Sequence, residues 1–412
     1  TESAASARTA SRVLASTSTA TKNAVLRDLA AAILAARADV LDANARDMAA
    51  ARESGLADAK LRRLELTEAG LEQMAEGLNQ LAELPDPVGA VTRDATVPSG
   101  LRVKKVRCPL GVIMMIYEAR PGVTIDAFAL CFKAGNACIL KGGREASESN
   151  AALAALARTV LSKHSLPSHA ITAITTSDRD EIKHLLTLDE SIDLVIPRGG
   201  RSLIDFVHEH ARIPTVQHFN GVCHIYVAPD ADLPRAIEIC ATAKASAPAT
   251  CNATACVLVD RTMADQFIPA LAERVAQDNV TIHADTHAMK LAAGPHVVPA
   301  TEADWGHEYL SLDLAVRVVA DMEEAIRHVD AHGTRHTEAI LTTSDTRAAE
   351  FTRRVDASCV ITNASTRFND GFQLGLGAEI GISTTKIHAF GPMGLEELTT
   401  QRFIVEGTGQ TR

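Results

Sequence analysis

Cys251 is the residue of this chain whose type and setting best suit chemistry. It lies in residues 247–253, where small and polar neighbours surround the thiol, and an apolar run at 257–259 follows. A thiol placed in such a loop can be exposed enough to attack a carbonyl carbon. The chain has eight cysteines, however, and a free cysteine is usually a small buried apolar residue. Other motifs must therefore single out Cys251 as a nucleophile.

Two glycine-containing turns could hold a nucleotide. Arg198, Gly199 and Gly200 follow a predicted strand and open a helix, which suits a pyrophosphate, although an ordinary strand-to-helix turn fits equally well. Lys141 follows another strand and could reach a ribose or its 2′-phosphate, or lie in a solvated loop. Neither a GxGxxG fingerprint nor a Walker A loop is present, and the glycines of 375–381 have the wrong spacing. A bound dinucleotide would therefore be held in an unusual way.

The bulk composition argues against several classes of protein. The net charge of −10 argues against a nucleic-acid partner, which needs a basic surface. No run approaches the roughly 18 apolar residues of a membrane helix. The cysteines form no CxxC pair, and His208 and His210 lack the i, i+4 spacing of a helical zinc site, so no metal is expected. Without a secretory signal, we expect reduced thiols and a cytoplasmic location.

Hydrophobic periodicity divides the chain into helical and α/β segments. The first ten residues are expected to be frayed, 10–84 to form amphipathic helices and 91–107 to be extended. From residue 110 apolar runs alternate with helical segments, which predicts parallel, doubly wound sheets. In the first block, Ser177 is expected to cap a short helix. Strands are expected at 111–117, 137–140, 170–174 and 192–196, and in a second block at 224–227, 255–259, 314–319, 338–341 and 359–362.

Several long stretches together carry a resemblance to a known family. They are residues 109–113, 116–121, 196–200, 221–227, 250–252, 363–368, 375–379 and 391–395. In these stretches the chain resembles the aldehyde dehydrogenase superfamily and, within it, the γ-glutamyl phosphate reductase family, from about residue 10 to 405. The resemblance implies an α/β fold of two doubly wound domains with a small oligomerisation element, and a homodimer or larger assembly. The dinucleotide-binding domain is expected at 1–225 with 370–395 returning to it, the catalytic domain at 226–369 and the oligomerisation segment at 396–412.

The resemblance also implies a reaction, the NADPH-dependent reduction of L-glutamyl 5-phosphate to L-glutamate 5-semialdehyde on the route to proline. Cys251 would attack the acyl phosphate and form a thioester, which hydride from the nicotinamide reduces. Its thiolate calls for a lowered pKa, which a positive environment would supply. Lys141 would contact the adenosine ribose and Glu379 the nicotinamide ribose. The pyrophosphate would lie at Arg198, Gly199 and Gly200.

Four residues are expected around the oxyanion and the substrate: Gly122, Asn252, Arg367 and Phe390. Arg367 would bind the substrate carboxylate or the leaving phosphate, or else form a surface ion pair. His218 lies near where aldehyde-oxidising relatives keep a general base, which a reductase does not need, so a structural role is expected for it.

Four positions depart from the pattern usual in the family. Gly122 replaces an asparagine that donates to the oxyanion, Ala247 a bulky residue, Ala255 a glutamate and Phe390 an arginine. Loss of one oxyanion donor typically costs about 10²–10³ in rate. Two alternatives therefore stay open: a diverged paralogue acting on another acyl phosphate, thioester or aldehyde, and a catalytically silent subunit that binds, for instance, a glutamate kinase. The choice between NADPH and NADH also stays open.

Overall fold

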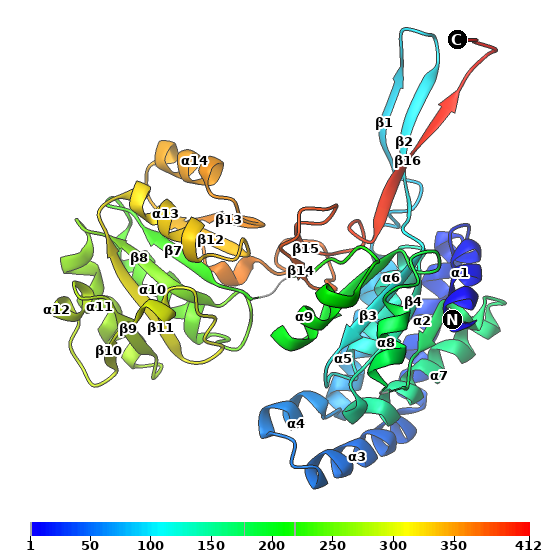
Figure 1. The fold of residues 1–412 in the computed structure, drawn as a ribbon, viewed down its shortest axis with the longest axis horizontal. Helices are drawn as coiled ribbons and strands as arrows, with labels where there is room; N and C mark the ends of the chain where they lie inside the picture. The colour runs from blue at the N-terminus through cyan, green and yellow to red at the C-terminus, as the bar shows by residue number, and fades with distance from the viewer. Residues whose placement is uncertain (1, 177, 218–219) are drawn as a thin grey trace.

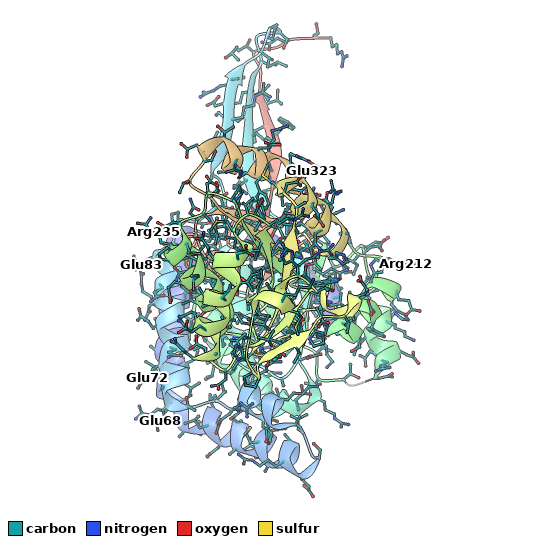
Figure 2. All side chains as sticks on the ribbon, turned by 90° about the vertical axis from the view of Figure 1, so that its left-hand side faces the viewer. Glu68, Glu72, Glu83, Arg212, Arg235 and Glu323 are labelled. Atoms are coloured by element: carbon teal, nitrogen blue, oxygen red, sulfur yellow. The ribbon has the colours of Figure 1, made fainter. Side chains whose placement is uncertain are left out.

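The computed structural model describes residues 2–176, 178–217 and 220–412, so Ser177 and His218 lie outside the described part. Figure 1 shows two α/β lobes, with three strands projecting from the N-terminal lobe as an arm. Charged side chains such as Glu72 and Glu323 point outward from the ribbon (Figure 2). None of the described helices has the length and apolar composition needed to cross a bilayer.

Five helices from the start of the chain belong to the N-terminal lobe. They are α1 (Glu2–Leu14), α2 (Thr19–Ala35), α3 (Arg37–Glu53), α4 (Asp58–Leu64) and α5 (Glu68–Glu83). The expectation of a frayed start was wrong, because Ala4, Ala7 and Ala10 lie three residues apart and are all buried on one face of α1. Arg8 fixes this helix to the lobe through hydrogen bonds of 2.6 and 2.9 Å to the carboxylate of Asp193.

A four-stranded parallel sheet forms the core of the N-terminal lobe, in the order β5-β4-β3-β6. Every residue of β3 and β4 is buried, as continuous apolar runs predict for strands covered on both faces. Asp178 caps α8, since its side chain accepts a hydrogen bond from the N–H of Asp180. The elements are β3 (Val112–Tyr117), α6 (Val123–Lys133), β4 (Ala137–Lys141), η1 (Arg144–Ala146), α7 (Ser147–Lys163), η2 (Ser168–Ala170), β5 (Ile171–Ala173), α8 (Arg179–Leu185), β6 (Leu194–Arg198) and α9 (Arg201–His210).

The C-terminal lobe contains a seven-stranded parallel sheet in the order β10-β9-β11-β8-β7-β12-β13. Strands β9 and β10 were missed in the sequence, because they are only four and three residues long. The elements are β7 (Cys223–Val227), α10 (Leu233–Ala245), β8 (Thr254–Asp260), α11 (Ala264–Ala276), β9 (Thr281–Ala284), α12 (Ala288–Leu291), β10 (Val297–Pro299), η3 (Glu302–Asp304), β11 (Asp313–Val319), α13 (Met322–His332), β12 (Thr337–Leu341), α14 (Asp345–Arg354) and β13 (Cys359–Thr362). The predicted fold class is thereby confirmed.

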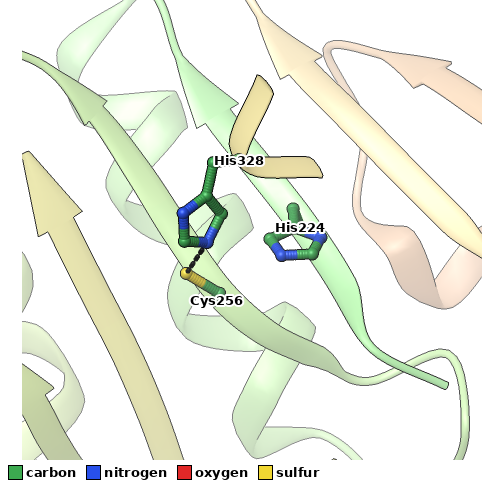
Figure 3. Close-up of side chains that lie close together, drawn as sticks. All are labelled: His224, Cys256 and His328. Carbon is green, nitrogen blue, oxygen red and sulfur yellow. Dashed lines mark hydrogen bonds between the residues drawn. The ribbon is translucent and has the colours of Figure 1, made fainter. Parts of the chain in front are cut away.

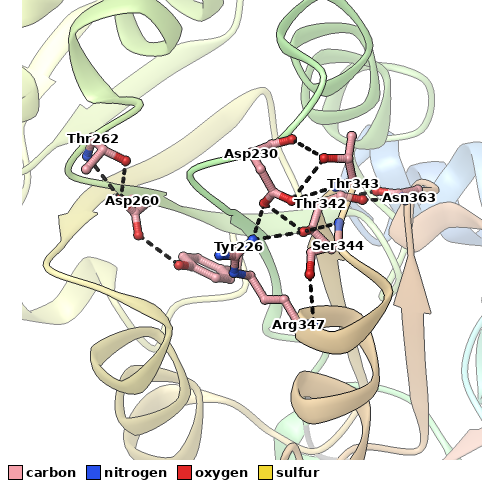
Figure 4. A network of polar contacts seen from close by, with 9 residues as sticks. All are labelled: Tyr226, Asp230, Asp260, Thr262, Thr342, Thr343, Ser344, Arg347 and Asn363. Atoms are coloured by element: carbon pink, nitrogen blue, oxygen red, sulfur yellow. Dashed lines mark hydrogen bonds and ion pairs between the residues drawn. The ribbon is translucent and has the colours of Figure 1, made fainter.

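Polar side chains close the carboxyl ends of three strands of this sheet (Figure 4). At the ends of β7 and β12, Asp230 accepts a 2.8 Å hydrogen bond from the hydroxyl of Thr342 and pairs with Arg347. The hydroxyl of Tyr226 donates to Asp260 at the end of β8, at 3.0 Å. These groups satisfy one another, whereas Cys251 precedes β8 and so lies at the opposite, amino-terminal edge.

The arm joins two distant parts of the chain. Strand β2 (Arg102–Pro109) pairs antiparallel with β1 (Val91–Thr96) on one side and with β16 (Thr399–Glu406) on the other. Between the C-terminal lobe and β16 the chain forms η4 (Thr366–Phe368), β14 (Ile382–Ser383) and β15 (Gly391–Pro392). The domain boundaries given above, and an oligomerisation role for 396–412, stay predictions.

Candidate active site

Cys251 lies in a tight loop between α10 and β8. The loop is held by hydrogen bonds from the Thr250 hydroxyl to the Ala247 carbonyl (2.8 Å) and from the Ala253 N–H to the Thr250 carbonyl (3.0 Å). Cys251 itself is half-buried, while Ala255, four residues on, is buried inside the strand. The predicted loop is therefore present, and its cysteine is partly exposed as a residue, while the accessibility of the sulfur itself stays a prediction.

Gly221, just before β7, and Cys223, its first residue, hold the backbone of Cys251 from one side. The thiol of Cys223 donates to the Cys251 carbonyl oxygen at 3.2 Å. A Cβ added to Gly221 would lie 2.0 Å from that same oxygen, so only glycine fits there. The sequence reasoning gave neither residue a role, although both fall in the stretch 221–227 that carried the resemblance.

Asn252 and Arg367 clamp the loop from another side. The Asn252 amide donates to the carbonyl oxygens of Asn369 (3.0 Å) and Arg367 (3.4 Å), and the Thr366 hydroxyl donates to the Asn252 carbonyl at 2.7 Å. The Arg367 guanidinium donates to the Thr250 hydroxyl at 2.9 Å and to the Asn252 side-chain oxygen. Both side chains therefore position the cysteine loop, whatever they also contact during the reaction.

The electrostatic setting of Cys251 differs from the expectation. Burial, with the carboxylates of Glu308 and Glu379 next in importance, raises the pKa of the thiol to about 12, while Arg198 acts in the opposite direction. The positive environment implied by the resemblance is thus outweighed by burial and the two carboxylates, which favour the protonated thiol. Glu308 was not found in the sequence, because it lies 57 residues from Cys251 along the chain and in no recognisable motif.

The turn after β6 meets the end of β3. The N–H of Gly200 donates to the carboxylate of Glu118 at 3.1 Å, and a Cβ on Gly199 would lie 2.9 Å from the carboxyl carbon of Glu118. Arg198 donates to the carbonyl oxygen of Ile380, which places the neighbouring Glu379 beside this turn. A carboxylate on the N-terminus of α9 shows that these backbone donors can bind an anion.

Lys141 lies in a cavity of about 330 Å³ at the carboxyl ends of β3 and β4, lined also by Lys60, Glu118, Arg179 and Leu203. The ammonium group of Lys141 donates to the Gly142 carbonyl at 2.5 Å, and burial lowers its pKa. Side chains on the two glycines after Lys141 would collide with Asn150 or Glu145 at about 2.2 and 2.1 Å. A cradle lined by glycines and lysines fits the phosphates and ribose of a dinucleotide.

Gly122 and Phe390 show what the departures from the family pattern do to the site. Gly122 precedes the first residue of α6, and a Cβ there would meet only the Met74 methyl carbon, at 3.6 Å, so a larger residue has room. Phe390 is half-buried, and the ammonium of Lys386 lies 5.2 Å from its ring centre. This cation lies near the place of the usual arginine, but it is already paired with the carboxylate of Asp356.

The structure joins the predicted residues into two groups. Direct hydrogen bonds link Asn252 and Arg367 to the Cys251 loop, and electrostatic interaction links Arg198 and Glu379 to its sulfur. Lys141 shares its cavity with Glu118, the partner of Gly200. No contact ties Gly122 or Phe390 to Cys251 among the interactions of the described residues, so their substrate roles stay predictions.

This geometry agrees with what the chain is similar to. A model of the aldehyde dehydrogenase family matches residues 1–310. Proteins named γ-glutamyl phosphate reductase from Desulfatibacillum aliphaticivorans and Salinibacter ruber are each 49% identical over 409 residues, 99% of this chain and 97% and 93% of theirs. The crystal structure of the Thermotoga maritima γ-glutamyl phosphate reductase has a TM-score of 0.97 and 39% identity, covering 100% of this chain and 99% of that one. The chain therefore belongs to the aldehyde dehydrogenase family and, within it, to the γ-glutamyl phosphate reductases.

Proposed function

We propose that this protein reduces L-glutamyl 5-phosphate to L-glutamate 5-semialdehyde with NADPH and releases phosphate. The observation that carries the proposal is the clamped Cys251 loop, whose thiol interacts electrostatically with Arg198 and Glu379, in a chain 49% identical to proteins named for this reduction. A diverged substrate or a silent subunit is not favoured, because relatives that are 49% identical over 99% of this chain are named for this reduction.

Cys251 would act as the nucleophile. Its sulfur forms a bond to the acyl carbon, and the bond from that carbon to the phosphate oxygen breaks, leaving a thioester on the protein. The thiol proton must leave first, and Glu308, whose own pKa is raised by burial, is a carboxylate able to take it. The Cys251 N–H would donate to the oxyanion. When bound, the nicotinamide supplies the hydride that reduces the thioester.

The cradle around Lys141 would hold the cofactor. Lys141 would contact the adenosine ribose, the backbone of Gly199 and Gly200 the pyrophosphate, and Glu379 the nicotinamide ribose. The cavity is also lined by two further cations, Lys60 and Arg179, and no ion pair joins either to a carboxylate within the described residues. Unpaired cations beside a ribose site favour a 2′-phosphate, which supports NADPH over NADH.

One assay tests the function. Reduction of NADP⁺ with glutamate 5-semialdehyde and phosphate should occur, and Cys251→Ala should abolish it. Cys240→Ala, at a buried cysteine of α10 in the same lobe, is the matched control and should retain activity. Turnover only with other aldehydes, or turnover that survives Cys251→Ala, would overturn the proposal.

The proposal also covers how the protein assembles, what it binds and where it is located. The arm exposes Val91, Phe403 and Val405 by 55%, 61% and 54%, and such apolar strands suit pairing in a homodimer or larger oligomer. A stable monomer in sedimentation would contradict this. All eight cysteines are unpaired, which suits a reducing compartment such as the cytoplasm. The substrate is a small acyl phosphate or aldehyde, and a glutamate kinase is a candidate partner.

A further inference from the structure

A second group of chemically capable side chains lies in the C-terminal lobe and has no part in the reaction above. It consists of His224 on β7, Cys256 on β8 and His328 on α13 (Figure 3). The three residues are 1%, 0% and 4% exposed. One donor atom from each lies within 4.8 Å of the others. Two imidazoles and a thiol therefore lie close together in the buried interior of the lobe.

His224 is oriented as a metal-binding histidine is. Its Nδ1 donates to the Glu338 carboxylate at 2.9 Å, and its backbone N–H donates to the same oxygen at 3.0 Å. With the proton on Nδ1, the lone pair is on Nε2, a buried atom that has no hydrogen-bond partner in the described structure. A carboxylate that fixes the ring and its tautomer is the usual outer partner of a histidine ligand. An acceptor buried without a partner calls for a ligand.

Cys256 faces the other imidazole. Its sulfur lies 4.0 Å from Nε2 of His328, a distance too long for more than a weak contact. Figure 3 shows the sulfur next to the His328 ring, with the His224 ring beside them. Two nitrogens and one sulfur form a donor set that prefers zinc or monovalent copper to calcium or magnesium.

We propose that His224, Cys256 and His328 bind one closed-shell d¹⁰ cation, Zn²⁺ or Cu⁺, through the two Nε2 atoms and the sulfur. On binding, the S–H bond of Cys256 breaks, a sulfur–metal bond forms, and the proton leaves to solvent. The sequence did not indicate this site, because its ligands are 32 and 72 residues apart and come from two strands and a helix.

The positive charge of Arg317 lies beside His328 and should weaken binding of a cation, so replacing Arg317 tests the site. Its guanidinium lies 3.2 Å from Nδ1 of His328, and because a guanidinium can only donate, His328 keeps its proton on Nε2. Metal binding requires this ring to change tautomer and Arg317 to turn fully toward Glu324, whose carboxylate is already 3.5 Å away. In Arg317→Gln the side-chain oxygen can accept from Nδ1–H and one positive charge is gone. This variant should bind the metal more tightly.

The experiment measures metal per chain in protein from cultures supplemented with zinc or copper, so that the site can load as the chain folds. Cys251→Ala removes the half-buried thiol and is the background for every sample. The background and its Cys240→Ala control should each retain about one metal ion after desalting against a chelator. Adding Cys256→Ala should lower the content at least about tenfold, and adding Arg317→Gln should raise the chelator concentration needed for removal at least about tenfold.

The outcomes separate the two metals and a purely structural cluster. If only protein from the zinc culture retains metal, the site binds Zn²⁺. If only protein from the copper culture retains metal, it binds Cu⁺. Cobalt-grown protein should show a thiolate-to-cobalt absorption that is lost in Cys256→Ser, a variant of nearly equal size that checks against misfolding. Metal content that is negligible in every sample, or unchanged by the Cys256 substitutions, would overturn the site. The proposal is independent of the assigned reaction.

Discussion

The thiol of Cys223 and the carbonyl oxygen of Cys251 are joined by a 3.2 Å hydrogen bond across the start of β7 and β8. Gly221 approaches the same oxygen so closely that no side chain fits between them. The peptide after Cys251, the proposed nucleophile, is therefore fixed by the neighbouring strand, and the direction of its sulfur depends on residues that take no part in the proposed chemistry.

Replacing Gly221 with alanine should disable the enzyme without unfolding it. The new methyl group would lie 2.0 Å from the Cys251 carbonyl oxygen and must push the loop aside. Because a displacement near 1 Å can cost about 10²-fold in rate, we expect kcat to fall by that order. Gly77→Ala is the control, since nothing lies within 4 Å of that position and helix α5 should gain slightly in stability. Equal kcat in the two variants would refute the role of Gly221.

Glu308→Gln should make Cys251 more acidic. The carboxylate of Glu308 raises the pKa of this thiol, so its removal lowers that pKa and increases the thiolate fraction at neutral pH. Each unit of pKa changes the thiolate fraction about tenfold while the thiol predominates. The measurement is the pH profile of iodoacetamide alkylation, which should shift to lower pH. Exposed Glu302→Gln should leave the profile in place.

The same Glu308→Gln variant separates two effects. If Glu308 also accepts the thiol proton during turnover, kcat should fall even though alkylation becomes faster. A parallel rise of alkylation and kcat would leave Glu308 with a purely electrostatic effect and remove it from the mechanism.

Gly122→Asn should raise activity. The position directly before helix α6 has room for a side chain, because a Cβ there would meet only the Met74 methyl carbon, at 3.6 Å. If the missing amide is the second oxyanion donor, kcat should rise at least about tenfold, a part of the 10²–10³ that such a donor contributes. Gly122→Ala adds bulk without a donor and should show no gain. Equal rates for the two variants would place the oxyanion elsewhere.

Arg179→Ala should weaken NADPH and spare NADH. This arginine lines the Lys141 cavity, and no acidic group pairs with it in the described ranges. We expect KM for NADPH to rise about tenfold, the effect of one charge-assisted contact, with kcat unchanged. Lys183→Ala, whose lysine lies 3.5 Å from Asp180 on the same helix, is the control. A similar rise of KM for both nucleotides would point to the shared part of the cofactor instead of the 2′-phosphate.

Phe390→Arg should restore an anion site. An arginine there adds a second cation beside Lys386, and we expect KM for the glutamyl substrate to fall about tenfold. The control is Phe372→Arg, the same substitution at a side chain that is 60% exposed, and it should leave KM unchanged. An unchanged KM would show that Phe390 has no role in substrate binding.

The sequence could predict features set by residues that lie close together in the chain, but not those set by contacts between distant residues. The buried strands β3 and β4 were found because a run of apolar residues is a local pattern, and the Cys251 loop because of its small polar neighbours. Helix α1 was missed because its face is made of alanines, whose weak hydrophobicity looks like a polar tail. Glu308 and the Gly221 contact could not be found, since each depends on which strands become neighbours.

The carboxylate of Glu118 on the N–H of Gly200 has a consequence for how this enzyme turns over. If the proposed pyrophosphate binds at this turn, it meets a donor that Glu118 already satisfies, so an arriving nucleotide would exchange one anion for another. That exchange would cancel part of the attraction of the Gly200 amide and limit how tightly the spent nucleotide is retained. A residue that weakens binding in this way favours departure, and departure often limits the rate of such enzymes.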